Sequence, residues 1–121
     1  MLIGYMRVST ADQSFDLQAD ALKAAGCGRI FQDVASGIKA DRPGLDECLA
    51  YLRDGDDTLI VWKSDRLGRS LSHLVEIIES MKIRKIGFKS LTEGMMDTTT
   101  ADGALMFGLF ALLAQHERNR L

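Results

Sequence analysis

The chain begins with Met1-Leu2-Ile3-Gly4-Tyr5-Met6-Arg7-Val8-Ser9-Thr10, and this stretch sets the fold class. It predicts a buried strand over residues 2–8 that runs out of apolar residues where Arg7 and Ser9 appear. Because these two residues lie at i and i+2, their side chains leave a strand on the same side. A hydroxyl beside a guanidinium at the C-terminal end of a strand suits phosphate chemistry. A polar strand exit followed by a Ser/Thr helix cap also explains the stretch, and the stretch taken alone favours this second explanation.

Length and composition indicate one globular domain of 121 residues, with ordinary hydrophobic (46%) and charged (26%) fractions. The net charge of −2 gives no overall basic character, so nucleic-acid binding would need a local patch or a part beyond this sequence. Cys27 and Cys48 lack CxxC spacing, so we expect free thiols in a reducing compartment. We expect no signal peptide, because the N-terminus goes straight into a strand pattern. We expect no membrane partner, because the longest apolar run, 104–114, is too short for a span, and we expect a cytoplasmic protein.

Strand and helix patterns alternate along the chain. Strands are expected over residues 2–8, 29–33, 58–62 and 86–91. Helices are expected through Leu17, Ala21, Leu22, Ala24 and Ala25, then from Pro43 through Leu45, Cys48, Leu49 and Leu52, then from Leu71 to about Lys85. The strand at 58–62 is the most apolar and is predicted to be central. This alternation predicts an α/β fold, with a mostly parallel four- to five-stranded sheet flanked by helices.

The segment from Ala104 to Ala114 is apolar nearly all round, whereas a surface helix shows one apolar stripe. We therefore expect this helix to bury more than one face, either within the domain or against another chain. The polar residues from Gln115 to Leu121 contain no Gly or Pro that would stop a helix. We expect the chain to be a fragment or the helix to project from the domain, with simple fraying of the helix end as the alternative.

Cationic residues gather in three segments that follow or precede predicted elements. Arg7 lies beside Ser9, and Arg42 comes just before a helix. Lys63, Arg66 and Arg69 cluster after the central strand. Ligands of parallel sheets bind beyond the C-terminal strand ends, so the segments after the first and central strands are predicted to converge at one edge. If residues 65–69 are helical, Arg66 and Arg69 share a face and Asp65 reaches Arg69 at i, i+4.

Arginine suits phosphate because its planar fork grips two oxygens and stays charged at physiological pH. Several arginines around one hydroxyl can stabilise the charge that builds on a transferring phosphoryl group. A metal could do the same, but neither His73 nor His116 has a ligand partner at metal spacing. A metal-free and cofactor-free arginine site therefore fits the sequence better. A solvated helix start with a surface salt bridge explains the segment 65–69 about equally well on its own.

Several blocks of this sequence, in order and over essentially its whole length, resemble the catalytic domain of the serine recombinases, in particular the resolvase and DNA invertase group. The blocks are Tyr5-x-Arg7-Val8-Ser9-Thr10, Asp12-Gln13, Leu17-Gln18, Ser36-Gly37, Asp41-Arg42-Pro43-Gly44-Leu45, Lys63-x-Asp65-Arg66-Leu67-Gly68-Arg69-Ser70, Ser90-Leu91-Thr92-Glu93, Asp97-Thr98-Thr99-Thr100 and Glu117-Arg118. The resemblance implies that Ser9 is a nucleophile that attacks a DNA phosphodiester, becomes a 5′-phosphoserine and frees a 3′-hydroxyl. Because the covalent link retains the energy of the phosphodiester, religation would need neither ATP nor a metal.

The resemblance also implies roles for other residues. Catalytic or phosphate-binding roles fall on Arg7, Arg42, Asp65, Arg66 and Arg69, and supporting roles on Tyr5, Gln13, Gln18 and Lys63. An oligomer interface is implied on the last helix at Met106, Phe107, Leu109, Phe110 and Leu113. Residues 1–99 would form the catalytic core, and residues 100–121 would begin a long dimerisation helix. The implied partners are double-stranded DNA at a specific site and further copies of the chain, which form a dimer and then an active tetramer. The resemblance also implies a protein that works inside a bacterium and is encoded by the bacterium, a phage or a mobile element.

Two departures from the family pattern matter. The family's long helix normally continues into a helix-turn-helix domain, which this sequence lacks, so we expect this chain alone to read DNA sequence poorly. Gln115-His116 precedes Glu117-Arg118 where more acidic or apolar residues are typical, which affects details of the interface. Two other hypotheses stay open: a non-catalytic phosphate- or nucleotide-binding α/β module that oligomerises through its last helix, and a dormant assembly domain of the same fold.

Overall fold

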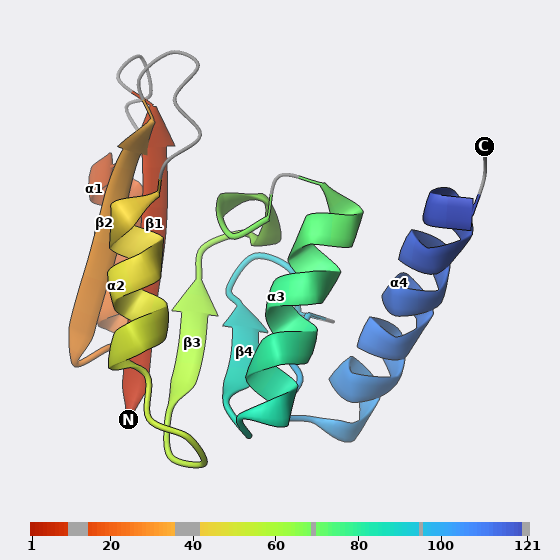
Figure 1. Ribbon diagram of the computed structural model, residues 1–121. Coiled ribbons are helices and arrows are strands. Elements are labelled where there is room, and N and C mark those ends of the chain that lie inside the picture. The colour runs from red at the N-terminus through yellow and green to blue at the C-terminus, as the bar shows by residue number, and fades with distance from the viewer. Residues whose placement is uncertain (10–14, 36–41, 69, 95, 120–121) are drawn as a thin grey trace.

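The computed structural model describes residues 1–9, 15–35, 42–68, 70–94 and 96–119 (Figure 1). The described strands are β1 (Leu2–Ser9), β2 (Arg29–Ala35), β3 (Thr58–Val61) and β4 (Gly87–Ser90). The described helices are α1 (Phe15–Ala24), α2 (Pro43–Tyr51), α3 (Leu71–Ile83) and α4 (Ala101–Asn119), with a 3₁₀ turn, η1, at Ser64–Arg66. The predicted alternation of strand and helix is therefore confirmed, with boundaries shifted by a few residues.

The four described strands form one sheet in the order β2-β1-β3-β4, and every neighbouring pair is parallel. The apolar strand β3 lies inside the sheet, as predicted, with β1 on one side and β4 on the other. Beyond β4, an isolated antiparallel bridge joins Lys89 to Asp97. The amide of Thr98 donates to the carbonyl of Phe88 there, so the outer edge of β4 is partly covered by the segment that leads to α4.

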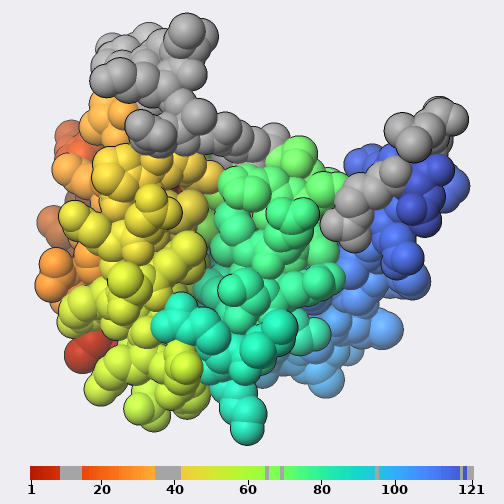
Figure 2. Space-filling model, viewed as in Figure 1, coloured from red at the N-terminus to blue at the C-terminus, as the bar shows by residue number. Residues whose placement is uncertain are grey.

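Alternation along the strands separates two apolar layers. Ile3 and Tyr5 of β1 face a large cluster that includes residues of α2, α3 and α4, while Met6 faces a smaller one with Leu22 of α1. In Figure 1, α2 and α3 lie in front of the sheet, α1 lies behind it, and α4 runs along the outer side of α3. The space-filling view from the same side shows α2, α3 and α4 as a continuous surface (Figure 2).

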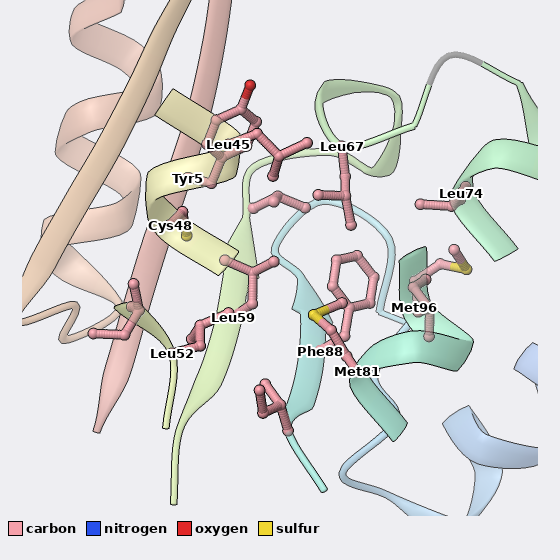
Figure 3. Packing of buried hydrophobic residues seen from close by; sticks show 14 of the residues in the cluster. Tyr5, Leu45, Cys48, Leu52, Leu59, Leu67, Leu74, Met81, Phe88 and Met96 are labelled. Atoms are coloured by element: carbon pink, nitrogen blue, oxygen red, sulfur yellow. The ribbon is translucent and has the colours of Figure 1, made fainter. Parts of the chain in front are cut away.

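The main core fills the space between the sheet and α2 and α3 (Figure 3). Leu45, Cys48 and Leu52 give α2 its buried face, which is the spacing predicted from the sequence. Burial raises the pKa of the Cys48 thiol to about 12, so this cysteine is a neutral packing group. In Figure 3 the Tyr5 hydroxyl points out of the cluster, toward the edge at which β1 ends.

The prediction for the apolar face of α1 was partly wrong. Leu22 is fully buried, but Leu17 is 54% exposed and Ala24 is also exposed. The other fully buried residue of this helix is Gln18, one turn before Leu22. Because neighbouring residues are turned by about 100° on a helix, a face centred on positions 18 and 22 leaves Leu17 at its border. Helix α1 therefore buries only a narrow stripe against this side of β1.

Helix α4 carries two apolar stripes on opposite sides. Phe107 and Ala114 are buried toward α3, with Phe110 and Ala111 packed beside them. The other side is lined by exposed leucines, which are Leu105, Leu109, Leu112 and Leu113. Of the five predicted interface residues, Leu109 and Leu113 lie on the exposed stripe, Met106 and Phe110 are half-buried, and Phe107 belongs to the core of this chain. None of the helices within the described ranges has the length and apolar character needed to cross a membrane.

Candidate active site

The C-terminal ends of β1 and β3 lie side by side at one edge of the sheet, as the sequence predicts. These strands pair in parallel up to Tyr5 and Val61, and β1 then continues to Ser9. The chain leaves β3 into η1, which lies against β1. The strand end at Ser9 and the turn that contains Asp65 and Arg66 are therefore neighbours, and Figure 1 shows both at the same end of the sheet.

Arg42 holds the turn after β3 in place. Its side chain is buried, with Nη1 donating to the carbonyl oxygen of Leu67 at 2.5 Å and Nη2 to that of Arg66 at 2.5 Å. Its Cζ lies 5.6 Å from the centroid of the Tyr5 ring. The planar guanidinium fork can reach two carbonyls at once, which an ammonium group cannot match. The structure thus gives Arg42 a positioning contact that the sequence did not predict.

The condition that residues 65–69 form one helix is not met in the part that the structure describes. The 3₁₀ turn ends at Arg66, and Gly68 is not helical. A Cβ on Gly68 would lie 2.6 Å from the Cα of Leu74, so the chain passes too close to α3 for a larger residue. Ser70 then has an extended backbone and its Oγ accepts the N–H of His73, which starts α3 as a new helix. Arg69 lies outside the described residues.

Asp33, near the end of β2, fixes the start of α2. Arg42 occupies the N-cap position of α2 but makes no capping hydrogen bond with its side chain. The carboxylate of Asp33 instead accepts the N–H of Gly44 at 2.7 Å and that of Leu45 at 2.9 Å. A Cβ on Gly44 would lie 2.1 Å from the carbonyl oxygen of Gln32, so only glycine allows this approach of the helix to β2. Asp33 thereby fixes the position of the backbone at Arg42, which directly precedes α2.

Tyr5 shares the same carboxylate. Its hydroxyl donates to Oδ2 of Asp33 at 2.7 Å, and its ring is fully buried. Burial, and then the hydrogen bond to Asp33, raise the pKa of the Tyr5 hydroxyl against the opposing effect of Arg42. The hydroxyl is therefore a neutral donor at physiological pH. The Tyr5 side chain therefore contacts both Asp33, through its hydroxyl, and Arg42, through its ring.

Glu93 fixes the same turn from its other side. Its Oε1 accepts the backbone N–H of Ser64 at 2.6 Å and the hydroxyl of Ser90 at 2.8 Å, and its Oε2 accepts the hydroxyl of Ser64 at 3.1 Å. Glu93 lies in one of the family blocks without an expected role, and Asp33 was not predicted as a site residue. The available signal was a carboxylate within three residues of a strand end, which is where caps and turn acceptors are found.

The other predicted site residues lie around this edge to different extents. Arg7 is half-buried on β1, in register with Asp33 of β2, and its carbonyl accepts Nε2 of the buried Gln18 at 3.1 Å. Lys63 is exposed directly before η1. Arg66 is half-buried, with its Cζ 5.7 Å from the centroid of the Trp62 ring. Ser9 and Asp65 are placed by the backbone of β1 and η1, and Gln13 lies outside the described residues.

Two cavities in the described part of the chain lie along α3. In the described part of the chain, His, Cys, Asp and Glu side chains form no group of three or more that could hold a metal ion. One cavity, of about 260 Å³, lies against α3 and is lined by Leu49, His73 and Arg84 among others. Another, of about 350 Å³, lies between α3 and α4 beside Phe107. Neither includes a residue of the strand ends.

Comparison with known proteins extends these observations. The family model described as "Resolvase, N terminal domain" matches residues 2–121. A DNA-invertase of Escherichia phage P1 is 53% identical over 118 residues, which cover 98% of this chain and 62% of that protein. The serine recombinase gin of Escherichia phage Mu is 51% identical over 118 residues, which cover 98% of this chain and 60% of that protein. The chain thus spans about three fifths of the length of these relatives.

Solved structures show the same similarity in three dimensions. The N-terminal catalytic domain of TP901-1 integrase superimposes with a TM-score of 0.79 at 31% identity, covering 98% of this chain and 96% of that one. A resolvase family site-specific recombinase from Streptococcus pneumoniae superimposes with a TM-score of 0.80 at 20% identity, covering 98% of this chain and 87% of that one, which supports the fold alone. The resemblance found in the sequence blocks is confirmed.

Proposed function

The chain belongs to the resolvase N-terminal domain family, and on that premise we propose that it is the catalytic part of a serine site-specific DNA recombinase. The observation that carries the proposal is the meeting of the Ser9 end of β1 with the η1 turn, which Arg42 and Glu93 hold from two sides. A passive anion site does not need a hydroxyl-bearing strand end beside such a turn. Double-stranded DNA at a specific site is the substrate that this chemistry fits.

In the proposed reaction the Oγ of Ser9 attacks a DNA phosphorus and gives up its proton. An Oγ–P bond forms while the P–O3′ bond breaks, and the leaving 3′ oxygen takes a proton, which produces a 5′-phosphoserine and a free 3′-hydroxyl. Religation reverses these steps on a new partner strand and needs neither metal nor ATP. Arg7, Arg66 and Arg69 would stabilise the charge on the phosphoryl oxygens, with Asp65 and Lys63 beside them. Arg42, Tyr5 and Gln18 would hold the strand end and the turn, and Gln13 would assist.

The test is a chimera in which this chain replaces the matching residues of the Escherichia phage P1 DNA-invertase, offered that relative's own recombination site with a labelled 3′ end, because the fragment that becomes linked to the protein keeps that end. We expect a covalent protein–DNA adduct on a denaturing gel, in the same amount with and without EDTA. Mass spectrometry of the trimmed adduct should locate the nucleotide on Ser9. A cleavage product that vanishes with EDTA would point to a metal-dependent nuclease, and DNA binding without any adduct would favour the non-catalytic phosphate-binding module.

Assembly is the second part of the proposal. We divide the chain into a catalytic core, residues 1–99, and the start of a dimerisation helix, residues 100–121. What supports this division is the exposed leucine stripe on α4, opposite the stripe that packs on α3. A homodimer, and a tetramer when two DNA sites are joined, would cover that stripe. We propose that the protein acts on DNA in the bacterial cytoplasm, and the phage and transposon origin of its relatives supports this location.

Leu109→Glu is expected to shift the chain from dimer toward monomer in sedimentation velocity. Leu109 is 48% exposed in the single chain, and covering a leucine is worth about 1.5–3 kcal/mol. A carboxylate in the same interface would also have to lose its water. Ala50→Glu, at an exposed position on α2, adds the same charge away from α4 and serves as the control. A wild-type chain that stays strictly monomeric at high concentration would contradict the interface.

A further inference from the structure

Glu93 makes more hydrogen bonds to the turn after β3 than its place in a surface loop would suggest. The chain segments after β3 and β4 stay paired beyond the strands: Leu91 N–H donates to the carbonyl of Val61, and both the N–H and the hydroxyl of Thr92 donate to that of Trp62. This pairing places Glu93 next to Ser64, the first residue of η1. The backbone N–H groups at the start of such a turn lack internal partners, so a carboxylate there satisfies one of them.

The three contacts of Glu93 use both oxygens. Oε1 accepts from the amide of Ser64 and the hydroxyl of Ser90, and Oε2 accepts from the hydroxyl of Ser64. Burial by itself raises the pKa of Glu93, but the hydrogen bonds from Ser64 and Ser90 and the charge of Lys63 outweigh it and lower the pKa. An ionised carboxylate that already accepts three hydrogen bonds is suited to hold the turn and poorly suited to take a proton.

We propose that Glu93 is the positioning residue that fixes the Ser64–Arg66 turn beside the end of β1. The inference rests on the proposed function for its catalytic consequence, because Arg66 must meet the same phosphate that Ser9 attacks. Arg42 holds the carbonyl end of the turn, at Arg66 and Leu67, whereas Glu93 holds its amide end, at Ser64. Removal of either contact leaves one end of the turn unfixed, and displacements of about 1 Å can cost about 100-fold in rate.

The structural half of the proposal is tested on this chain without DNA. Trp62 is the chain's single tryptophan and lies two residues before η1, so its fluorescence reports the turn directly. Glu93→Ala is expected to increase acrylamide quenching of Trp62 and to change its emission maximum, while circular dichroism keeps the wild-type shape. Glu93→Gln keeps an acceptor for the Ser64 amide and is expected to fall between the two. Glu47→Ala, at an exposed position on α2, is the matched control and should leave Trp62 unchanged.

The pH dependence follows from the lowered pKa of Glu93. Its ordinary value is 4.5, so the stability that the carboxylate contributes is complete above that pH and is lost as the pH falls through the lowered folded value. The difference in melting temperature between wild type and Glu93→Gln should therefore be constant from pH 7 to about pH 5 and shrink below it. A difference that grows on acidification, or Trp62 fluorescence that is identical in wild type and folded Glu93→Ala, would overturn the proposal.

The catalytic half uses the chimera with the phage P1 relative. At saturating DNA, Glu93→Ala is expected to slow adduct formation about 100-fold while the Kd for DNA stays unchanged, and Glu93→Gln should recover part of the rate. A loss that lies wholly in DNA affinity, or none at all, would overturn the positioning role. If the wild-type chimera itself forms no adduct, the proposed function fails, and the Trp62 measurement still decides whether Glu93 holds the turn.

Discussion

Replacement of Ser9 by alanine is expected to abolish the covalent adduct between the chimera and its DNA site. The reaction needs an oxygen at the end of β1 that can bond to phosphorus, and alanine offers none. In the proposed reaction the arginines would stabilise charge on the phosphate, but they cannot form the 5′-phosphoserine link. The readout is the labelled band on a denaturing gel, which should fall to the level of a sample without protein.

The fold and the DNA affinity of this variant should be retained. Ser9 is the last residue of β1, and its neighbours in register are set by backbone pairing with β2, which alanine preserves. Ser80→Ala, on the exposed side of α3, is the matched control and should form the adduct at the wild-type rate. An adduct that persists in Ser9→Ala would show that another residue is the nucleophile, and mass spectrometry of the linked peptide would identify it.

The layout of the sheet could be predicted because its signals are local. The first ten residues and the run at 58–62 are both rich in apolar residues, which indicates buried strands. Because these strands pair in parallel, their C-terminal ends lie at the same edge of the sheet. That single geometric rule predicts that the Ser9 end of β1 lies beside the turn of Asp65 and Arg66. The rule needs only the type and order of the elements, which periodicity supplies.

The supports of the site could not be predicted in the same way. Asp33 meets Tyr5 across 28 positions of sequence, and Glu93 meets Ser64 across 29. No periodicity links residues at such distances, and each carboxylate is also consistent with an ordinary turn. The positioning contacts of Arg42 could not be predicted for the same reason. Sequence places a cation near the edge, but only the folded chain shows that both of its Nη groups bind carbonyls of the turn.

The second large effect is expected at Asp33, whose replacement by alanine should lower the free energy of unfolding by about 3–4 kcal/mol. Asp33 is 8% exposed, and its carboxylate accepts hydrogen bonds from the Tyr5 hydroxyl and from the amides of Gly44 and Leu45. Loss of a helix cap costs about 1 kcal/mol, and each buried donor left without an acceptor costs about 1–3 kcal/mol. Urea unfolding followed by circular dichroism measures the change.

Tyr5→Phe is the matched control, because it removes one of the three hydrogen bonds and leaves the cap of α2 intact. Tyr5→Phe should lower the free energy of unfolding by about 1 kcal/mol. In a protein that already carries Tyr5→Phe, Asp33→Ala should lower it by less than in wild type, because no Tyr5 hydroxyl is left without an acceptor. Asp33→Ala should also loosen Arg42, which leaves the backbone one residue before α2, so adduct formation by the folded variant should slow as well. Equal costs for Asp33→Ala and Tyr5→Phe would mean that the cap contributes nothing. The start of α2, and with it the position of Arg42, would then have to be fixed by the packing of Leu45 and Cys48 alone.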